Sequence, residues 1–154
     1  LPIFLKSSKN TNIFNLTHKD MTRFNITLKQ GVNFVHWCMA NNNGGEIFIP
    51  KLYSYNVMDI AKAISQNARF KIIGIKPGEK IHEELLSSSD SINSMEGKNF
   101  YVIFNYINKE QSRKFIKKHS MKKVKNRFVY SSETCKKISI KNLKKLIAEF
   151  KKNN

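Results

Sequence analysis

The sequence is poor in cysteine and has no long apolar run, and each shortage excludes a class of protein. Cys38 and Cys135 are the two cysteines among 154 residues, too few and too far apart to suggest a disulfide scaffold or a zinc site. Reduced thiols in the cytoplasm are therefore expected. No apolar stretch approaches the ~18 residues that a membrane helix needs, so we expect no membrane span.

Acidic residues and arginines are also scarce. There are 11 Asp+Glu against 28 Lys+Arg, a net charge of +17, and residues 99–154 alone carry 16 basic residues against three acidic ones. Lysines outnumber arginines 24 to 4, whereas specific nucleic-acid readers favour the bidentate guanidinium. We therefore favour a compositional drift toward lysine over nucleic-acid binding. The alternative is a basic module that uses residues 106–154 against nucleic acid or an anionic surface.

What remains is enough for a folded domain. Hydrophobic residues make up 40% of the chain and aromatic residues 11%, which suffices for a core. The first residue is Leu1, with no initiator methionine and no basic-then-apolar signal pattern, so we expect a fragment of a longer protein. Residues 108–127 contain few apolar side chains to bury, and we expect that segment to be mobile.

Apolar spacing predicts strands that alternate with helices, an α/β pattern. A helix is expected from Thr27, which forms a capping box with Gln30. Its apolar face is expected to comprise Leu28, Val32, Val35 and Met39. The remaining helices are predicted over residues 56–64, 81–86, 110–118 and 139–150. The strands are predicted over residues 11–16, with Ile13 and Phe14 as the buried pair, 46–50, 70–75, 100–107 and 128–130.

Two loop segments carry charged groups in positions suited to an anionic ligand. Thr22 and Arg23 directly precede the capped helix, and the guanidinium of Arg23 suits bidentate phosphate binding. The alternative is a surface ion pair with Asp20. Lys76 and Glu79 flank a Pro-Gly turn after a predicted strand, where ligands of α/β sheets bind. They can serve a phosphate and a sugar diol respectively, unless the segment is only a solvated turn.

His82 suggests no metal site. It precedes two glutamates, but no second cluster of ligands stands at a suitable spacing, and the other three histidines are scattered. We interpret His82 as part of the first turn of a short helix, where the dipole favours the glutamates.

Taken together, four ordered segments resemble one family. They are MTRF-x-ITL-x-x-GVNFV (21–35), GGEIFIPK (44–51), D-I-A-x-A-I (59–64) and IGIKPGEKIHEEL (73–85). All are similar to the C-terminal half of UDP-N-acetylglucosamine 4,6-dehydratases, CapD-like extended short-chain dehydrogenase/reductases of polysaccharide biosynthesis. The tail, with Tyr130-Ser131-Ser132 and then Ile138-Ser139-Ile140, resembles that family's closing turn and terminal helix. The resemblance covers residues 1–105 and 128–150 and leaves 106–127 as a variable basic insertion.

The resemblance implies a role for each charged residue. Arg23, with Thr22 beside it, falls on the arginine that contacts the UDP pyrophosphate. Lys76 falls where the family usually has an arginine on the same pyrophosphate. It keeps the positive charge but lacks the bidentate hydrogen bonding of a guanidinium. Glu79 falls on the acidic residue that accepts hydrogen bonds from the uridine ribose. Asn25 stands where tryptophan is common, which removes packing behind the arginine.

The family's redox half is missing. Its members bind NAD(P) at a Gly-rich turn after the first strand and use a Tyr-x-x-x-Lys pair. The paired glycines here, Gly44 and Gly45, follow a helix, and no predicted helix carries Tyr-x-x-x-Lys: Val57 stands four places after Tyr53. We expect no catalytic residue, no bound NAD(P) and no metal in this chain.

The sequence thus predicts an α/β chain, the C-terminal substrate-binding part of an extended, Rossmann-type dehydrogenase/reductase fold. It is organised as a UDP-binding part (1–105), a basic insertion (106–127) and a terminal strand and helix (128–154). The expected function is that of a cytoplasmic dehydratase fragment that binds a UDP-sugar, UDP-N-acetylglucosamine above all. A separate chain carrying the missing half is the expected partner.

Overall fold

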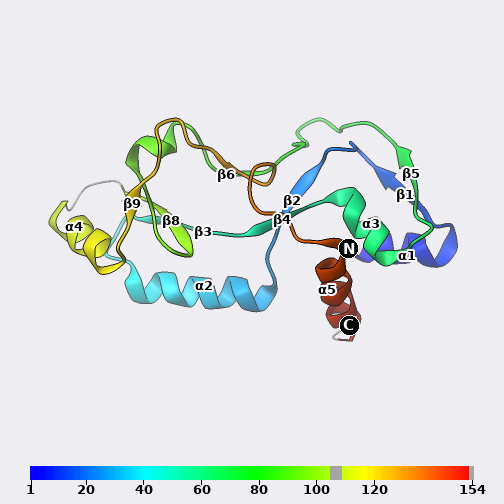
Figure 1. Ribbon diagram of the computed structural model, residues 1–154, viewed down its shortest axis with the longest axis horizontal. Coiled ribbons are helices and arrows are strands. Elements are labelled where there is room, and N and C mark those ends of the chain that lie inside the picture. Colours follow the sequence, from blue (N-terminus) through cyan, green and yellow to red (C-terminus); the bar gives the residue numbers. More distant parts are fainter. Residues whose placement is uncertain (105–108, 153–154) are drawn as a thin grey trace. The chain divides into compact units, whose positions relative to one another are not determined.

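The computed structural model describes residues 1–104 and 109–152, which divide into two compact units (Figure 1). Unit 1 comprises residues 1–25 and 53–83 and the chain from Ser132 on. Unit 2 comprises residues 26–52 and 84–131. The chain passes between the units several times, so neither unit is a continuous stretch of sequence.

Unit 1 is a helical layer with two short strand pairs. Its helices are α1 (Pro2–Asn10), α3 (Val57–Ile64) and α5 (Ile140–Lys152), and its strands are β1 (Ile13–Leu16), β2 (Thr22–Asn25), β4 (Tyr53–Asn56) and β5 (Arg69–Ile72). β1 pairs with β5 in parallel, and β2 pairs with β4 in antiparallel register with Arg23 opposite Tyr55. α3 packs on α5. The buried apolar side chains are Phe14, Leu16, Met21, Ala61, Leu143 and Ile147.

Unit 2 is built on an antiparallel sheet in the order β3-β8-β7-β9. Its helices are α2 (Leu28–Asn41), η1 (Asp90–Asn93) and α4 (Lys109–Lys118), and its strands are β3 (Ile47–Pro50), β6 (Glu84–Leu86), β7 (Ser94–Glu96), β8 (Phe100–Ile103), β9 (Lys122–Lys123) and β10 (Tyr130–Ser131). β6 and β10 form a separate antiparallel pair. The core cluster is Phe100, Val102, Phe104, Phe115 and Met121.

Local signals in the sequence predicted most of these elements. The Thr27–Gln30 capping box is present, with both reciprocal hydrogen bonds, at the start of α2. Asn56 caps α3 through a hydrogen bond that its side chain accepts from Met58 N (2.8 Å). The Oγ of Ser139 accepts a hydrogen bond from Asn142 N (3.3 Å) at the start of α5. The segment predicted as residues 100–107 forms β8 as far as Ile103, and its last three residues lie outside the described ones.

Two predictions about which side chains are buried are wrong. The apolar stripe of α2 is exposed, because the opposite side of the helix, with Phe34 and Trp37, packs on the core of unit 2. In β1 the buried pair is Phe14 and Leu16, whereas Ile13 is exposed. Alternate residues of a strand face the same side, so Phe14 and its second neighbour share the core face.

Packing against distant segments overturns one further prediction and the premise of another. The predicted helix 81–86 is absent: residues 81–83 are an irregular segment, and Glu84–Leu86 forms β6 by pairing with β10. His82 therefore does not begin a helix. The basic segment is not poor in buried apolar groups, since Phe115, Met121 and Val124 are each less than a tenth exposed.

Candidate functional site

Arg23 is held in place from three sides within unit 1. Its Nη1 donates hydrogen bonds to the carbonyl oxygens of Thr22 (2.7 Å) and Ile81 (3.1 Å). Its Nε lies 3.5 Å from Oε1 of Glu83, whose other oxygen accepts a hydrogen bond from Phe24 N (3.3 Å). Arg23 thus pairs with Glu83 and, among the described residues, makes no ion pair with Asp20. The guanidinium is oriented before any ligand arrives.

Tyr55 lies opposite Arg23 in the β2–β4 pair. Burial and the nearby Glu83 carboxylate raise the pKa of its hydroxyl, and the Arg23 charge opposes this. The phenol therefore stays protonated at neutral pH and remains a hydrogen-bond donor beside the guanidinium.

Thr22 is buried, 2% exposed, and its hydroxyl joins segments that are distant in sequence. Its Oγ1 lies 2.8 Å from Nδ1 of His82 and 2.7 Å from Oγ of Ser132. The Oγ of Ser132 also accepts a hydrogen bond from Glu83 N (2.9 Å). On the other side of the imidazole, Nε2 of His82 lies 3.6 Å from a carboxylate oxygen of Glu133. This network fixes residues 81–83, the segment that holds Arg23.

Lys76 and Glu79 lie at the two ends of one turn. Glu79 N donates to the carbonyl of Lys76 (3.0 Å), and Gly78 has φ +79°, the geometry of a type II turn. The carboxylate of Glu79 accepts hydrogen bonds from Lys76 N (3.3 Å) and from the hydroxyl of Thr17 (3.3 Å). The Lys76 ammonium is exposed and makes no ion pair with another described residue.

The loop that follows β5 runs alongside the β1–β2 segment and brings these groups to it. Glu79 contacts Thr17, Ile81 accepts a backbone hydrogen bond from Thr22 N (3.0 Å), and Glu83 binds Phe24 N, so both segments advance in the same direction. All four residues predicted for the site therefore belong to unit 1. No hydrogen bond or ion pair joins Arg23 or Thr22 to Lys76 or Glu79 within the described ranges.

Sequence reasoning missed Tyr55, Glu133 and four further residues of this arrangement. Glu83, His82 and Thr17 lie close to predicted site residues in the sequence or the loop, whereas Ser132 is 110 residues from Thr22. A polar cavity of about 380 Å³ adjoins the network and is lined by His18, Asp20, Thr22, Asn56, Ile81, His82, Glu133 and Lys137. The described residues contain no group of three or more side chains able to hold a metal ion.

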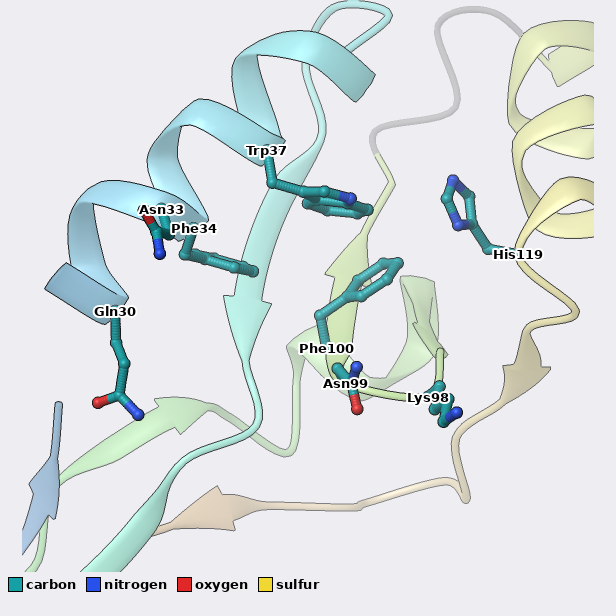
Figure 2. Close-up of a pocket in the computed structure, with 8 residues that line it drawn as sticks. All are labelled: Gln30, Asn33, Phe34, Trp37, Lys98, Asn99, Phe100 and His119. Carbon is teal, nitrogen blue, oxygen red and sulfur yellow. The ribbon is translucent and has the colours of Figure 1, made fainter. Parts of the chain in front are cut away.

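Unit 2 holds a second cavity, of about 490 Å³, that no predicted site residue lines (Figure 2). Figure 2 shows Phe34 and Trp37 projecting from α2 toward Phe100 and His119. The rings of Trp37 and Phe100 are 4.6 Å apart, and those of Trp37 and His119 are 5.6 Å apart. Burial, with Lys118 nearby, lowers the pKa of His119, which favours the neutral ring at neutral pH in this aromatic cluster.

The paired glycines do not form a dinucleotide cradle. Gly44 and Gly45 take positive φ values of +110° and +84°, but they lie between α2 and β3. A dinucleotide cradle needs a glycine turn that leads from a strand into a helix N-terminus, where amides face the pyrophosphate.

In the part of the chain that the structure covers, no helix has the length and apolar character to cross a membrane.

Comparisons with known proteins agree on one family. The family model of polysaccharide biosynthesis proteins matches residues 1–105. The inverting UDP-N-acetylglucosamine 4,6-dehydratase of Campylobacter jejuni serotype O:2 is 40% identical over 144 residues, which cover 86% of this chain and 41% of the dehydratase. The UDP-glucose 4-epimerase of Rickettsia akari is 27% identical, over 96% of this chain and 44% of the epimerase.

A solved structure shows the same fold. Pen from Bacillus thuringiensis superposes with a TM-score of 0.76 at 27% identity, over 97% of this chain and 44% of that protein. This chain thus spans less than half the length of these relatives, and it matches the C-terminal part of the dehydratase. Family match, identity and fold agree, so the chain belongs to the polysaccharide biosynthesis protein family, with the extended short-chain dehydrogenase/reductase fold.

Proposed function

We propose that this chain supplies the UDP-holding groups of a UDP-N-acetylglucosamine 4,6-dehydratase. The observation that carries the proposal is the docking of the loop after β5 along β2, which places two cations and a carboxylate on one unit. The C. jejuni relative that shares 40% identity is named as such a dehydratase. We assign NAD(P) and the catalytic groups to the part of the dehydratase that this chain does not match.

Each residue has a distinct role in this proposal. Arg23 binds the pyrophosphate with the guanidinium N–H groups that do not donate to the carbonyls of Thr22 and Ile81. Because its orientation is fixed, less conformational entropy is lost on binding. Lys76 adds a second, mobile positive charge. Glu79 accepts hydrogen bonds from the ribose hydroxyls, and Thr17 and the turn amide hold its carboxylate ready.

Thr22 takes part as a positioning residue. Thr22 lines the polar cavity, but both contacts of its buried hydroxyl are to side chains of this unit, so we assign its effect to the residues that it holds. It holds residues 81–83, and through them the Ile81 carbonyl and the Glu83 carboxylate that orient Arg23.

The rest of the proposal concerns partner and place. In this proposal a separate chain supplies the nucleotide-binding half, and turnover needs both halves, because proton and hydride transfer require groups positioned around the cofactor. The two free cysteines are consistent with a reducing compartment, and we propose a cytoplasmic location. Residues 1–105 remain the proposed UDP-binding part, with 106–127 as an insertion.

Calorimetric titration with UDP and with pyrophosphate tests the assignment. The protein is this chain co-expressed with the N-terminal part of the C. jejuni dehydratase, the part that it does not match. Glu79→Gln should lower the affinity for UDP about 10-fold or more and leave the affinity for pyrophosphate unchanged, since a charged hydrogen-bond partner contributes about 1.5–3 kcal/mol. Lys80→Gln, at an exposed lysine one place beyond the turn, is the matched control. Equal weakening of both ligands would refute the ribose assignment.

The second candidate, a basic nucleic-acid module, has less support. The lysines of α4 and β9 are exposed, as that function needs. The two aromatic side chains among them are engaged, however: Phe115 is 4% exposed, and the Phe128 ring lies 5.4 Å from that of Tyr101. Stacking on bases requires free ring faces. Binding of single-stranded DNA that survives physiological salt would favour this candidate.

A further inference from the structure

Helix α2 presents an apolar stripe to solvent. Leu28, Val32, Val35 and Met39 follow one another at i, i+4, i+7 and i+11, so they lie on one side of the helix. Their exposed fractions are 86%, 45%, 55% and 74% in that order. The stripe extends over about 16 Å, at 1.5 Å per residue.

The other side of α2 is already used. Phe34 and Trp37 pack against the unit 2 core cluster, and Figure 2 shows both side chains pointing toward Phe100. The helix is therefore apolar on two opposite sides, a pattern typical of helices that are covered on both. The helix has few charges that would oppose apolar association on its exposed side, because Lys29 is the only charged residue among its 14. Ile26, just before the helix, is 46% exposed and adds to the apolar surface.

The relatives indicate what covers the stripe. They are more than twice as long as this chain, which matches 41% of the dehydratase and 44% of Pen. The unmatched part, more than half of each relative, is long enough to form a folded body that could cover an apolar surface of this size. A second copy of this chain is a poorer occupant, because it would bring a net charge of +17 against +17.

We propose that the α2 stripe is the surface on which the nucleotide-binding half docks. The inference rests on the proposed function for the identity of that partner. A contiguous apolar strip rimmed by polar residues is typical of a protein interface. Docking buries the four side chains of the stripe and leaves the Trp37 side of the helix unchanged.

The test uses the full chain, alone and co-expressed with the tagged N-terminal part of the C. jejuni dehydratase. The double variant Leu28→Gln/Met39→Gln removes the two most exposed members of the stripe, and glutamine keeps a high helix propensity. Lys29→Gln, on the same turn as Leu28 but off the stripe, is the matched control. The fluorescence of Trp37, the single tryptophan, shows that unit 2 stays folded in each variant.

We expect the tagged half to retain the original chain and the Lys29 control equally, and to retain the double variant at least 10-fold less. Amide exchange across α2 should slow in the complex. Four outcomes would overturn the proposal: equal retention of the double variant, failure to retain the original chain, loss of stability of the double variant alone, or a homodimer that the double variant dissolves. The third would mean that this chain covers the stripe itself.

UDP titration of the same complex separates this inference from the proposed function. Retention through the stripe without UDP binding would leave the docking surface standing and refute the proposed function. UDP binding by a complex that tolerates the double variant would refute the docking surface alone.

Discussion

Removing the Thr22 hydroxyl should destabilise unit 1 by a measurable amount. Thr22→Val keeps the shape of the side chain and deletes the atom that lies 2.8 Å from His82 Nδ1 and 2.7 Å from Ser132 Oγ. A buried hydrogen bond contributes about 0.5–1.5 kcal/mol net, so the loss of two is worth about 1–3 kcal/mol. Ser132 retains its contact with Glu83 N, which favours the lower half of that range.

Amide exchange that resolves β2 and residues 81–83 is the appropriate assay, because Trp37 belongs to unit 2 and does not report on unit 1. A double-mutant cycle with Ser132→Ala should give a coupling energy of about 0.5 kcal/mol or more, as expected for residues in one network. Thr17→Val is the matched control. Its hydroxyl contacts Glu79 at 3.3 Å and is partly exposed, so the cost should be smaller.

The same variant tests the link to ligand binding. If residues 81–83 orient Arg23, Thr22→Val should lower the affinity for both UDP and pyrophosphate severalfold in the restored complex, since the guanidinium binds the pyrophosphate group of both ligands. A change in stability below about 0.5 kcal/mol, the range of neutral surface substitutions, would refute the network as a structural support. A loss of stability with unchanged affinity would refute only the positioning of Arg23.

Three further predictions concern single features of the two units. Thr27→Ala removes the capping box and should lower the stability of unit 2 by about 1 kcal/mol, measured by denaturant unfolding with Trp37 fluorescence. Because the pKa of His119 is lowered from 6.5, folded unit 2 disfavours the protonated imidazolium. The stability of unit 2 should therefore fall as the pH drops through 6.5, and His119→Gln should reduce this dependence of stability on pH. Gly78→Ala places a side chain at φ +79°, costing about 1–2 kcal/mol, and should weaken UDP more than Gly74→Ala, which imposes similar strain outside the turn.

Features governed by neighbouring residues could be predicted from the sequence. The capping residues Thr27 and Asn56 satisfy amides within the next three positions, and each helix begins where the pattern places it. The type II turn at Gly78 likewise depends on its own four residues. The four predicted site residues were identified because they adjoin these local signals, and all four belong to unit 1.

Choices between two apolar faces could not be predicted. The period of α2 identifies both the Leu28 stripe and the Trp37 side, and hydrophobicity alone does not say which side meets the sheet. Residues 81–86 form a strand instead of a helix because β10, more than 40 positions later, supplies a pairing partner. The Thr22–Ser132 contact spans 110 residues and leaves no local trace in the sequence.

The division into units has a consequence for how binding and docking combine. Thr22, Arg23, Lys76 and Glu79 belong to unit 1, whereas the α2 stripe belongs to unit 2, and no residue described here takes part in both. Substitutions without shared partners usually have additive effects. In the restored complex, Glu79→Gln and Leu28→Gln/Met39→Gln should therefore lower UDP affinity and partner retention independently. We expect the Glu79→Gln chain to be retained fully but to bind UDP poorly. We expect the retained fraction of the stripe variant to bind UDP normally. A large deviation from additivity would mean that UDP binding and docking share a conformational step.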